Sequence, residues 1–150
     1  MNYNKIIITG DAGRGKSTLA KIISEKLNIQ HHSTDDYFYE VKFSKSRDRQ
    51  EALKLISENY LSGKWIVEGT TYWLLEPGLK SADVIIYLRY KNILSQWFSI
   101  LKRGLFRKEE TISGILSLMK HVFYKRYKLG YKKGKMSHSE LLEPYKNKVL

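Results

Sequence analysis

The sequence predicts an α/β domain in which a parallel sheet is covered by helices on both faces. Strand-like runs alternate with helix-like segments along the 150 residues, which is typical of parallel strands joined by helices. The strand-like runs are apolar at consecutive positions, as expected for strands buried on both faces. A chain of this length makes one domain, so residues 1–150 are treated as a single unit.

The individual elements follow from local pattern. β-branched or apolar runs predict strands, and apolar residues at helical spacing predict helices. The predicted strands are 5–9, 29–33, 65–67 and 83–88, and residues 148–150 could begin a last one. The predicted helices are 16–27, 47–61, 92–102, 111–129 and 139–145. Gly63 ends the second of these helices.

Composition excludes several classes of protein. The chain is 42% hydrophobic and 28% charged, which is ordinary globular usage. It has no run of about 18 apolar residues, so no membrane span is expected. It has no cysteine, which excludes disulfides and thiolate sites and favours a cytoplasmic location. The N-terminal residues lack the apolar core of a signal peptide.

Positive charge is concentrated in the C-terminal part of the chain. The net charge is +12. Residues 1–88 hold 12 basic and 11 acidic residues, whereas residues 89–150 hold 15 basic and 4 acidic residues. The second part therefore carries +11 of the net charge and is expected to attract a polyanion such as a nucleotide or a nucleic acid.

A glycine-rich motif between the first strand and the first helix predicts a phosphate site. Residues 10–17 match G-x-x-x-x-G-K-S/T in full. Glycines let several N–H groups converge on one anion, Lys16 would neutralise the β- and γ-phosphates, and the Ser17 hydroxyl would bind Mg²⁺. The motif predicts the P-loop NTPase fold, and the alternative is an ordinary glycine-rich turn. The expected nucleotide contacts are Gly10, Asp11, Ala12, Gly13, Arg14, Gly15, Lys16, Ser17 and Thr18.

Carboxylates follow two of the predicted strands. Asp35 and Asp36 come after residues 29–33, and Glu68 ends the strand at 65–67. Carboxyl ends of parallel strands face the same crevice as the phosphate loop. Asp35 or Asp36 could therefore act on an acceptor hydroxyl, while Asp36 and Glu68 could support Mg²⁺. The alternatives are a helix cap at Asp35 or Asp36 and a surface glutamate at Glu68.

The basic C-terminal region has two competing interpretations. Residues 103–110 follow a predicted helix and look like a lid whose Arg103 and Arg107 would stabilise a migrating phosphoryl group, or else like a solvated basic loop. Further on, residues 111–135 interleave tyrosines with lysines, a pattern that could bind nucleic acid. The alternative there is a core-packed helix with a basic outer face.

These motifs together resemble the adenylate-kinase-like group of P-loop small-molecule kinases, and within it most closely the DNA topology modulation proteins. The matching stretches are residues 10–18, 31–36, 65–70, 83–88, 101–103 with Arg107, and 123–126. The resemblance implies a nucleotide-binding fold with five parallel strands and a helical lid. Two departures stand out: residues 37–40 (YFYE) replace an arginine that holds a monophosphate, and residues 71–73 (TYW) replace a proline–arginine pair. Residues 35–38 are also similar to the aspartate–aromatic stretch of uridine-kinase-like enzymes.

The sequence therefore predicts an ATP-dependent kinase that uses Mg²⁺ and transfers phosphate to a small-molecule acceptor. The expected catalytic residues are Lys16, Asp35, Asp36, Arg103 and Arg107, and the expected metal-binding residues are Ser17, Asp36 and Glu68. The competing hypothesis is a nucleotide-dependent protein that binds nucleic acid through its basic C-terminal region.

Overall fold

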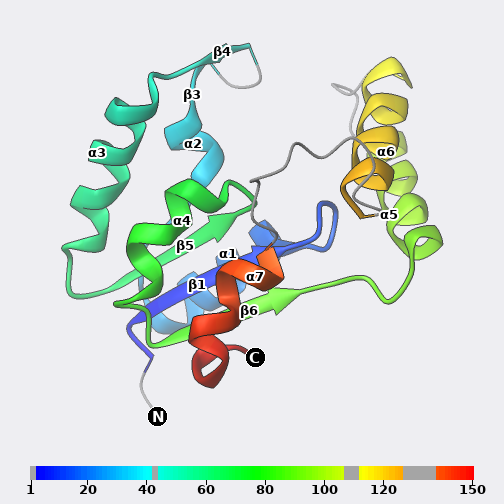
Figure 1. Cartoon of the computed structure of the whole chain (residues 1–150). Helices are drawn as coiled ribbons and strands as arrows, with labels where there is room; N and C mark the ends of the chain where they lie inside the picture. Colours follow the sequence, from blue (N-terminus) through cyan, green and yellow to red (C-terminus); the bar gives the residue numbers. More distant parts are fainter. Residues whose placement is uncertain (1–2, 42–43, 107–111, 127–137) are drawn as a thin grey trace.

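The computed structural model describes residues 3–41, 44–106, 112–126 and 138–150 (Figure 1). The strands are β1 (Lys5–Gly10), β2 (His31–Ser33), β3 (Tyr39–Val41), β4 (Lys45–Ser46), β5 (Trp65–Gly69) and β6 (Val84–Leu88). The helices are α1 (Lys16–Leu27), α2 (Thr34–Phe38), α3 (Arg49–Tyr60), α4 (Tyr72–Leu79), α5 (Ile93–Phe106), α6 (Ile112–Arg126) and α7 (His138–Leu142), followed by the 3-10 helix η1 (Glu143–Lys148).

Four parallel strands form the main sheet, in the order β2-β5-β1-β6. The prediction of five strands is wrong by one, because the last described residues make only a single parallel bridge, between Val149 and Ile85 of β6. The Leu150 N–H donates to the Ile85 carbonyl at 2.8 Å, and the Tyr87 N–H donates to the Leu150 carbonyl at 3.0 Å. The predicted fifth strand is thus present as one bridge at the β6 edge.

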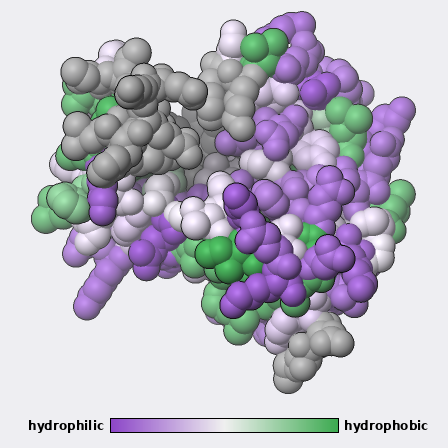
Figure 2. Space-filling model, turned by 180° about the vertical axis from the view of Figure 1, so that it is seen from behind, coloured by the Kyte–Doolittle hydropathy of each residue, from purple (hydrophilic) through white to green (hydrophobic). Residues whose placement is uncertain are grey.

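Helices cover both faces of the sheet, as predicted. Successive side chains of a strand point to opposite faces, so Ile7 of β1 enters one apolar cluster while Ile6 and Ile8 enter another. The Ile7 cluster is completed by α3, α4 and α7, and the second cluster includes Ala20 of α1. On the face that Figure 2 shows, the coloured residues are mostly hydrophilic, with separate hydrophobic spots.

Three elements have no counterpart among the predicted ones: α2, the antiparallel β3–β4 hairpin and α4. α2 has five residues, which is too short for a helical period to show. α4 contains Pro77 and Gly78, which are turn signals in a sequence. A tertiary contact overrides them: the Tyr60 hydroxyl donates to the Leu74 carbonyl at 2.9 Å, and its ring lies so close to Gly78 that a Cβ there would be 2.3 Å from it.

The start of the expected lid is helical. Residues 103–106 form the last turn of α5, so the backbone of Arg103 and Gly104 continues the helix that was predicted to end at residue 102. Residues 107–110, including Arg107, lie outside the described residues. The lid at 103–110 therefore stays a prediction.

Gly69, the last residue of β5, lies directly against Thr34, the first residue of α2. Its φ is +154°, and a Cβ there would lie 1.7 Å from Oγ1 of the buried Thr34. We expect Gly69→Ala to lower the free energy of unfolding by about 3 kcal/mol, because strain and overpacking add. Denaturant unfolding measures this. Gly63→Ala is the control, since a Cβ there meets no atom within 4 Å; equal losses in the two variants would contradict the close approach.

Candidate active site

The glycine-rich motif forms a turn between β1 and α1. Gly10, Gly13 and Gly15 have φ values of +129°, +80° and +80°, which L side chains rarely adopt. At Gly10 a Cβ would lie 2.0 Å from the Leu88 carbonyl oxygen of β6. Gly15 is the N-cap of α1 and supplies no side-chain cap. A helix start without such a cap offers its first N–H groups to an anion.

The outer side of this turn is held by the segment that joins β6 to α5 and by α5 itself. The Gly13 carbonyl accepts from the Tyr90 hydroxyl at 2.8 Å and from the Ser99 hydroxyl at 2.9 Å. The Ala12 carbonyl accepts from Nε2 of the buried Gln96 at 3.3 Å. We call Tyr90, Gln96 and Ser99 the carbonyl clamp, because their donors bind the loop's carbonyls. The clamp was missed from sequence, since no motif marks residues about 80 positions away.

Two further loop residues lie against Tyr90. The Asp11 carboxylate accepts from the Tyr90 N–H at 2.8 Å, and the Arg14 guanidinium lies 4.9 Å from the centre of the Tyr90 ring. The Asp11 N–H also donates to the Leu88 carbonyl at 2.8 Å. The sequence assigned Asp11 and Arg14 to nucleotide binding. These contacts indicate that the Asp11 side chain positions the loop.

We expect Tyr90→Phe to weaken triphosphate binding several-fold, because the Gly13 carbonyl loses one of its two donors while the ring stays. A hydrogen bond of this kind contributes about 1 kcal/mol, which is roughly a fivefold change in affinity. Calorimetric titration with a non-hydrolysable ATP analogue measures it. Tyr3→Phe is the control, because Tyr3 precedes β1 and so lies at the opposite end of that strand from the loop; equal affinities in the two variants would contradict a role for the clamp.

Lys16 opens α1 and bends back over the loop. Its ammonium group donates to the Asp11 carbonyl at 2.8 Å and to the Gly10 carbonyl at 3.3 Å, and its side chain is buried. The cation is therefore held at the turn where the phosphates of a nucleotide are expected. Thr18, next but one along the helix, is exposed.

Ser17, in the first turn of α1, and Glu68, near the end of β5, meet where the carboxyl ends of the parallel strands lie. The Ser17 hydroxyl donates to Oε1 of Glu68 at 2.9 Å, although 51 residues separate them in sequence. Glu68 lies in β5, next to β1, and is only 5% exposed. A buried carboxylate beside a hydroxyl at the carboxyl end of parallel strands is a donor set that suits Mg²⁺, which prefers oxygen ligands and keeps several waters and substrate phosphates. The alternative of a surface glutamate is thereby wrong.

No group of three His, Cys, Asp or Glu that could hold a metal by themselves occurs among residues 3–41, 44–106, 112–126 and 138–150. A kinase-type Mg²⁺ site does not need one, because the nucleotide provides part of the coordination.

Asp35 and Asp36 lie in the first turn of α2, directly after β2. Neither is the helix cap: the Ser33 hydroxyl takes that place and accepts from the Asp35 N–H at 3.4 Å. The capping alternative is thus wrong for both aspartates. Asp36 is exposed, and Asp35 is half-buried. β2 pairs with β5 so that Ser33 lies opposite Glu68, which places the start of α2 at the same sheet edge as the proposed metal-binding carboxylate.

A small polar network lies behind Asp36. Asn59 Nδ2 donates to the Tyr37 hydroxyl at 2.6 Å, and that hydroxyl lies 2.8 Å from Nδ1 of His32. Which of the Tyr37 hydroxyl and the His32 Nδ1 donates in this contact depends on the tautomer of His32. Burial, with the nearby His31, lowers the pKa of His32, which keeps it neutral at pH 7. Burial, with the Asp36 charge, raises the pKa of Tyr37.

The basic C-terminal region is described only in part. Lys120 of α6 lies 5.9 Å from the centre of the Tyr124 ring, which is the kind of pairing expected from interleaved cations and aromatics. Trp97 of α5 contacts Phe123 of α6, so this pair of helices packs together. The other cations invoked for the basic region, Lys125, Arg126, Lys128, Lys132 and Lys133, have side chains outside the described part of the chain. No helix among the described residues has the length and apolar character needed to cross a bilayer.

Comparison with known proteins gives relatives and fold neighbours. No family model matches the chain. It is 38% identical over 86 residues to the Bacillus subtilis protein YqaC, covering 55% of this chain and 47% of YqaC. It is 32% identical over 105 residues to an adenylate kinase of Mesomycoplasma hyopneumoniae, covering 67% of this chain and 47% of that enzyme. The chain therefore spans less than half the length of these curated relatives.

Solved structures agree on the fold. A shikimate kinase from Bacteroides thetaiotaomicron superposes with a TM-score of 0.51 at 19% identity, covering 85% of this chain and 80% of that one. A gluconokinase from Sinorhizobium meliloti superposes with a TM-score of 0.52 at 15% identity, covering 79% and 74%. The chain has the fold of the P-loop kinases. The similarity in sequence covers less than half of the adenylate kinase, and the similarity to the solved structures is one of fold.

Proposed function

We propose that the protein is an ATP-dependent kinase that transfers the γ-phosphate to the hydroxyl of a small molecule. The observation that supports this most directly is the Ser17–Glu68 hydrogen bond beside the glycine turn and Lys16. Glu68 lies near the end of β5, and the glycine turn and the start of α1 follow the adjacent parallel strand β1, the place where nucleotide sites form in such sheets. The kinases among the sequence relatives and fold neighbours are consistent with it.

The loop and α1 would bind the triphosphate. The N–H groups at the start of α1 would bind phosphate oxygens, and Lys16 would turn from the Asp11 carbonyl to the β- and γ-phosphates. Ser17 and Glu68 would hold Mg²⁺ directly or through water, and the ion when bound neutralises charge on the phosphates. The carbonyl clamp would keep the loop in shape while Lys16 moves.

Asp36 would act on the acceptor, with Asp35 as the second possibility. The acceptor oxygen forms a bond to the γ-phosphorus as the bond from that phosphorus to the β–γ bridging oxygen breaks. The hydroxyl proton goes to the exposed carboxylate and then to water. Arg103 and Arg107 would stabilise the transferring group from the lid, and this part of the proposal rests on the sequence pattern alone.

The test is ATP turnover against panels of hydroxyl-bearing small molecules, with the phosphorylated product identified by mass. Acceptor-dependent loss of the γ-phosphate, with Mg²⁺ present and no nucleic acid added, is the expected result. Mg²⁺ should raise the affinity for ATP, and Glu68→Gln should make that increase smaller when both affinities are measured by calorimetry. A folded protein that binds no Mg²⁺–ATP would contradict the kinase proposal.

Nucleic-acid binding remains the second candidate, because residues 89–150 carry a net charge of +11. It predicts oligonucleotide binding whose affinity falls steeply with salt, since binding would release counterions. Two other predictions made from the sequence stay predictions. They are the resemblance to DNA topology modulation proteins and the cytoplasmic location.

A further inference from the structure

Three aromatic side chains come from segments that follow β2 and β5, and two of them stand within four residues of the proposed acceptor carboxylates in the sequence. We call Phe38, Tyr39 and Trp73 the aromatic wall; all three are half-buried. Phe38 ends α2, the helix that carries Asp36, and Trp73 lies in the first turn of α4, just after β5. The Phe38 ring centre is 6.1 Å from that of Trp73 and 4.6 Å from that of Tyr39. The wall therefore follows the ends of β2 and β5, at the same sheet edge as Glu68.

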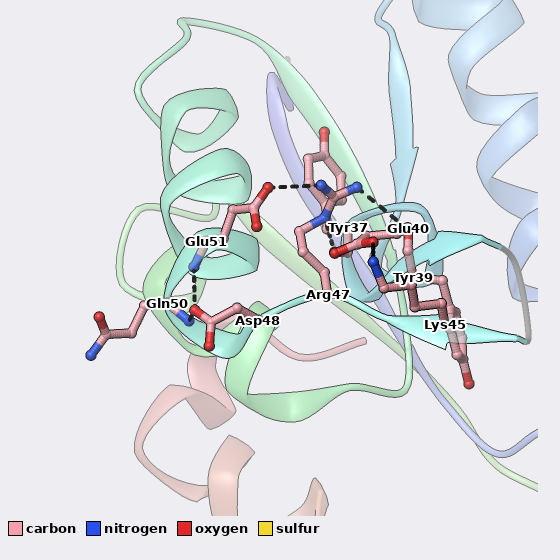
Figure 3. A network of polar contacts seen from close by, with 8 residues as sticks. All are labelled: Tyr37, Tyr39, Glu40, Lys45, Arg47, Asp48, Gln50 and Glu51. Carbon is pink, nitrogen blue, oxygen red and sulfur yellow. Dashed lines mark hydrogen bonds and ion pairs between the residues drawn. The ribbon is translucent and has the colours of Figure 1, made fainter.

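Arg47 fixes the backbone of the wall. Its Nε donates to the Tyr37 carbonyl at 3.1 Å, and its Nη2 reaches the Tyr39 carbonyl at 3.5 Å (Figure 3). Its Nη1 donates to Oε1 of Glu51 at 3.0 Å, which ties the same guanidinium to α3. The Arg47 side chain thus contacts the carbonyls of the residues just before and just after Phe38 in the sequence. The rings are held in place before any ligand arrives, which lowers the entropic cost of binding one.

The charge around the wall differs from that of the whole chain. Residues 35–51 hold five acidic and four basic residues, a net charge of −1, in a chain of +12. The described cations of this segment are already engaged: Lys45 pairs with Glu40, Arg47 with Glu51, and Arg49 lies 5.2 Å from the centre of the Trp73 ring. A phosphate monoester would thus approach Asp36 and compete with existing partners for every one of these cations.

We propose, on the basis of the kinase function above, that the acceptor is an uncharged compound that contains both a flat ring and a hydroxyl group. The ring would pack against the aromatic wall, where a stacked ring gains contact without needing a charge. The hydroxyl would lie at the start of α2, where Asp36 or Asp35 would take its proton in the transfer described above. An acceptor that already carries a phosphate is disfavoured by the two aspartates and by the engaged cations.

The experiment compares matched acceptors. Nucleosides serve as uncharged ring probes, the corresponding 5′-monophosphates as phosphate-bearing probes, and sugar acids and polyols as probes without an aromatic ring. Each is assayed with labelled ATP and Mg²⁺. We expect phosphorylated product from members of the nucleoside set, with kcat/KM at least tenfold above that of the matched monophosphates and of the non-aromatic probes.

Variants test the wall itself. Trp73→Leu and Phe38→Leu keep an apolar side chain against the core but remove the ring, so each should raise the acceptor KM about tenfold while the KM for ATP stays unchanged. Tyr145→Leu is the matched control, because Tyr145 is a half-buried aromatic on the same core cluster but belongs to η1. A purely structural effect would move all three variants together.

The outcomes separate this inference from the kinase proposal. If Mg²⁺–ATP binds but monophosphates, sugar acids or polyols are the better acceptors, the inference about the acceptor is overturned and the kinase proposal stands. The same holds if the nucleosides are not phosphorylated, or if the leucine variants leave the acceptor KM unchanged. If Mg²⁺–ATP does not bind at all, both are overturned.

Discussion

Lys16→Ala should abolish phosphoryl transfer and weaken triphosphate binding about 100-fold or more. The ammonium group is buried at the turn, where it bonds the Gly10 and Asp11 carbonyls in the absence of a ligand. With nucleotide present it would make charge-assisted contacts to the β- and γ-phosphates, and each such contact contributes about 1.5–3 kcal/mol. Turnover should fall by roughly 10³-fold, as when a donor to developing charge is removed.

Calorimetric titration and single-turnover assays separate the two effects of Lys16→Ala. Lys21→Ala on the same helix is the matched control, because Lys21 is exposed and its substitution removes the same charge from α1. Circular dichroism and denaturant unfolding must first establish that Lys16→Ala folds, since two loop carbonyls lose their donor. If the folded variant keeps the triphosphate affinity of the Lys21→Ala control, the phosphate loop does not bind nucleotide as proposed.

The main sheet was predictable because three of its strands, β1, β5 and β6, are largely apolar and its first turn carries a specific motif. Ile7, Val67 and Ile85 are fully buried in three adjacent strands, and such burial leaves a run of apolar letters in the sequence. The meeting of Ser17 with Glu68 also followed from sequence reasoning, because parallel strands end at one edge. The positions of Ser17 and Glu68 follow from the general rule that the carboxyl ends of parallel strands lie together.

The carbonyl clamp and α4 could not be predicted, because their causes are tertiary. Tyr90 and Ser99 both donate to the Gly13 carbonyl, which is far from them in the sequence. Neither residue belongs to a sequence motif that predicts such a hydrogen bond. α4 persists despite Pro77 because Leu74 and Gly78 meet Tyr60 of α3. Local propensity is a weak guide wherever a buried contact of this kind decides the conformation. The aromatic wall has the same origin, since Phe38 and Trp73 meet only in the folded chain.

Asp36→Asn should lower turnover by about 10²- to 10⁴-fold, the range that general acid–base groups supply. ATP affinity should change by less than a few-fold, because the proposed contact of Asp36 is to the acceptor in the transition state. Ser33, not Asp36, caps α2, so the variant keeps the helix cap, and the charge that it loses near the helix start contributes about 0.5 kcal/mol. The fold should therefore survive the change.

Steady-state kinetics on the identified acceptor decides between the two aspartates. Glu58→Gln provides the control, since this exposed carboxyl-bearing residue lies near the end of α3 and outside the proposed site. Asp35→Asn is measured beside it, because the half-buried Asp35 precedes Asp36 in the same turn.

A large loss of turnover in Asp36→Asn alone supports the exposed carboxylate as the group that takes the acceptor's proton. If Asp36→Asn stays within a few-fold of the unmodified protein while Asp35→Asn loses turnover, the role belongs to Asp35. If both aspartate variants retain turnover, the start of α2 does not carry the proton transfer, and Glu68 becomes the remaining carboxylate at this sheet edge with which to test it.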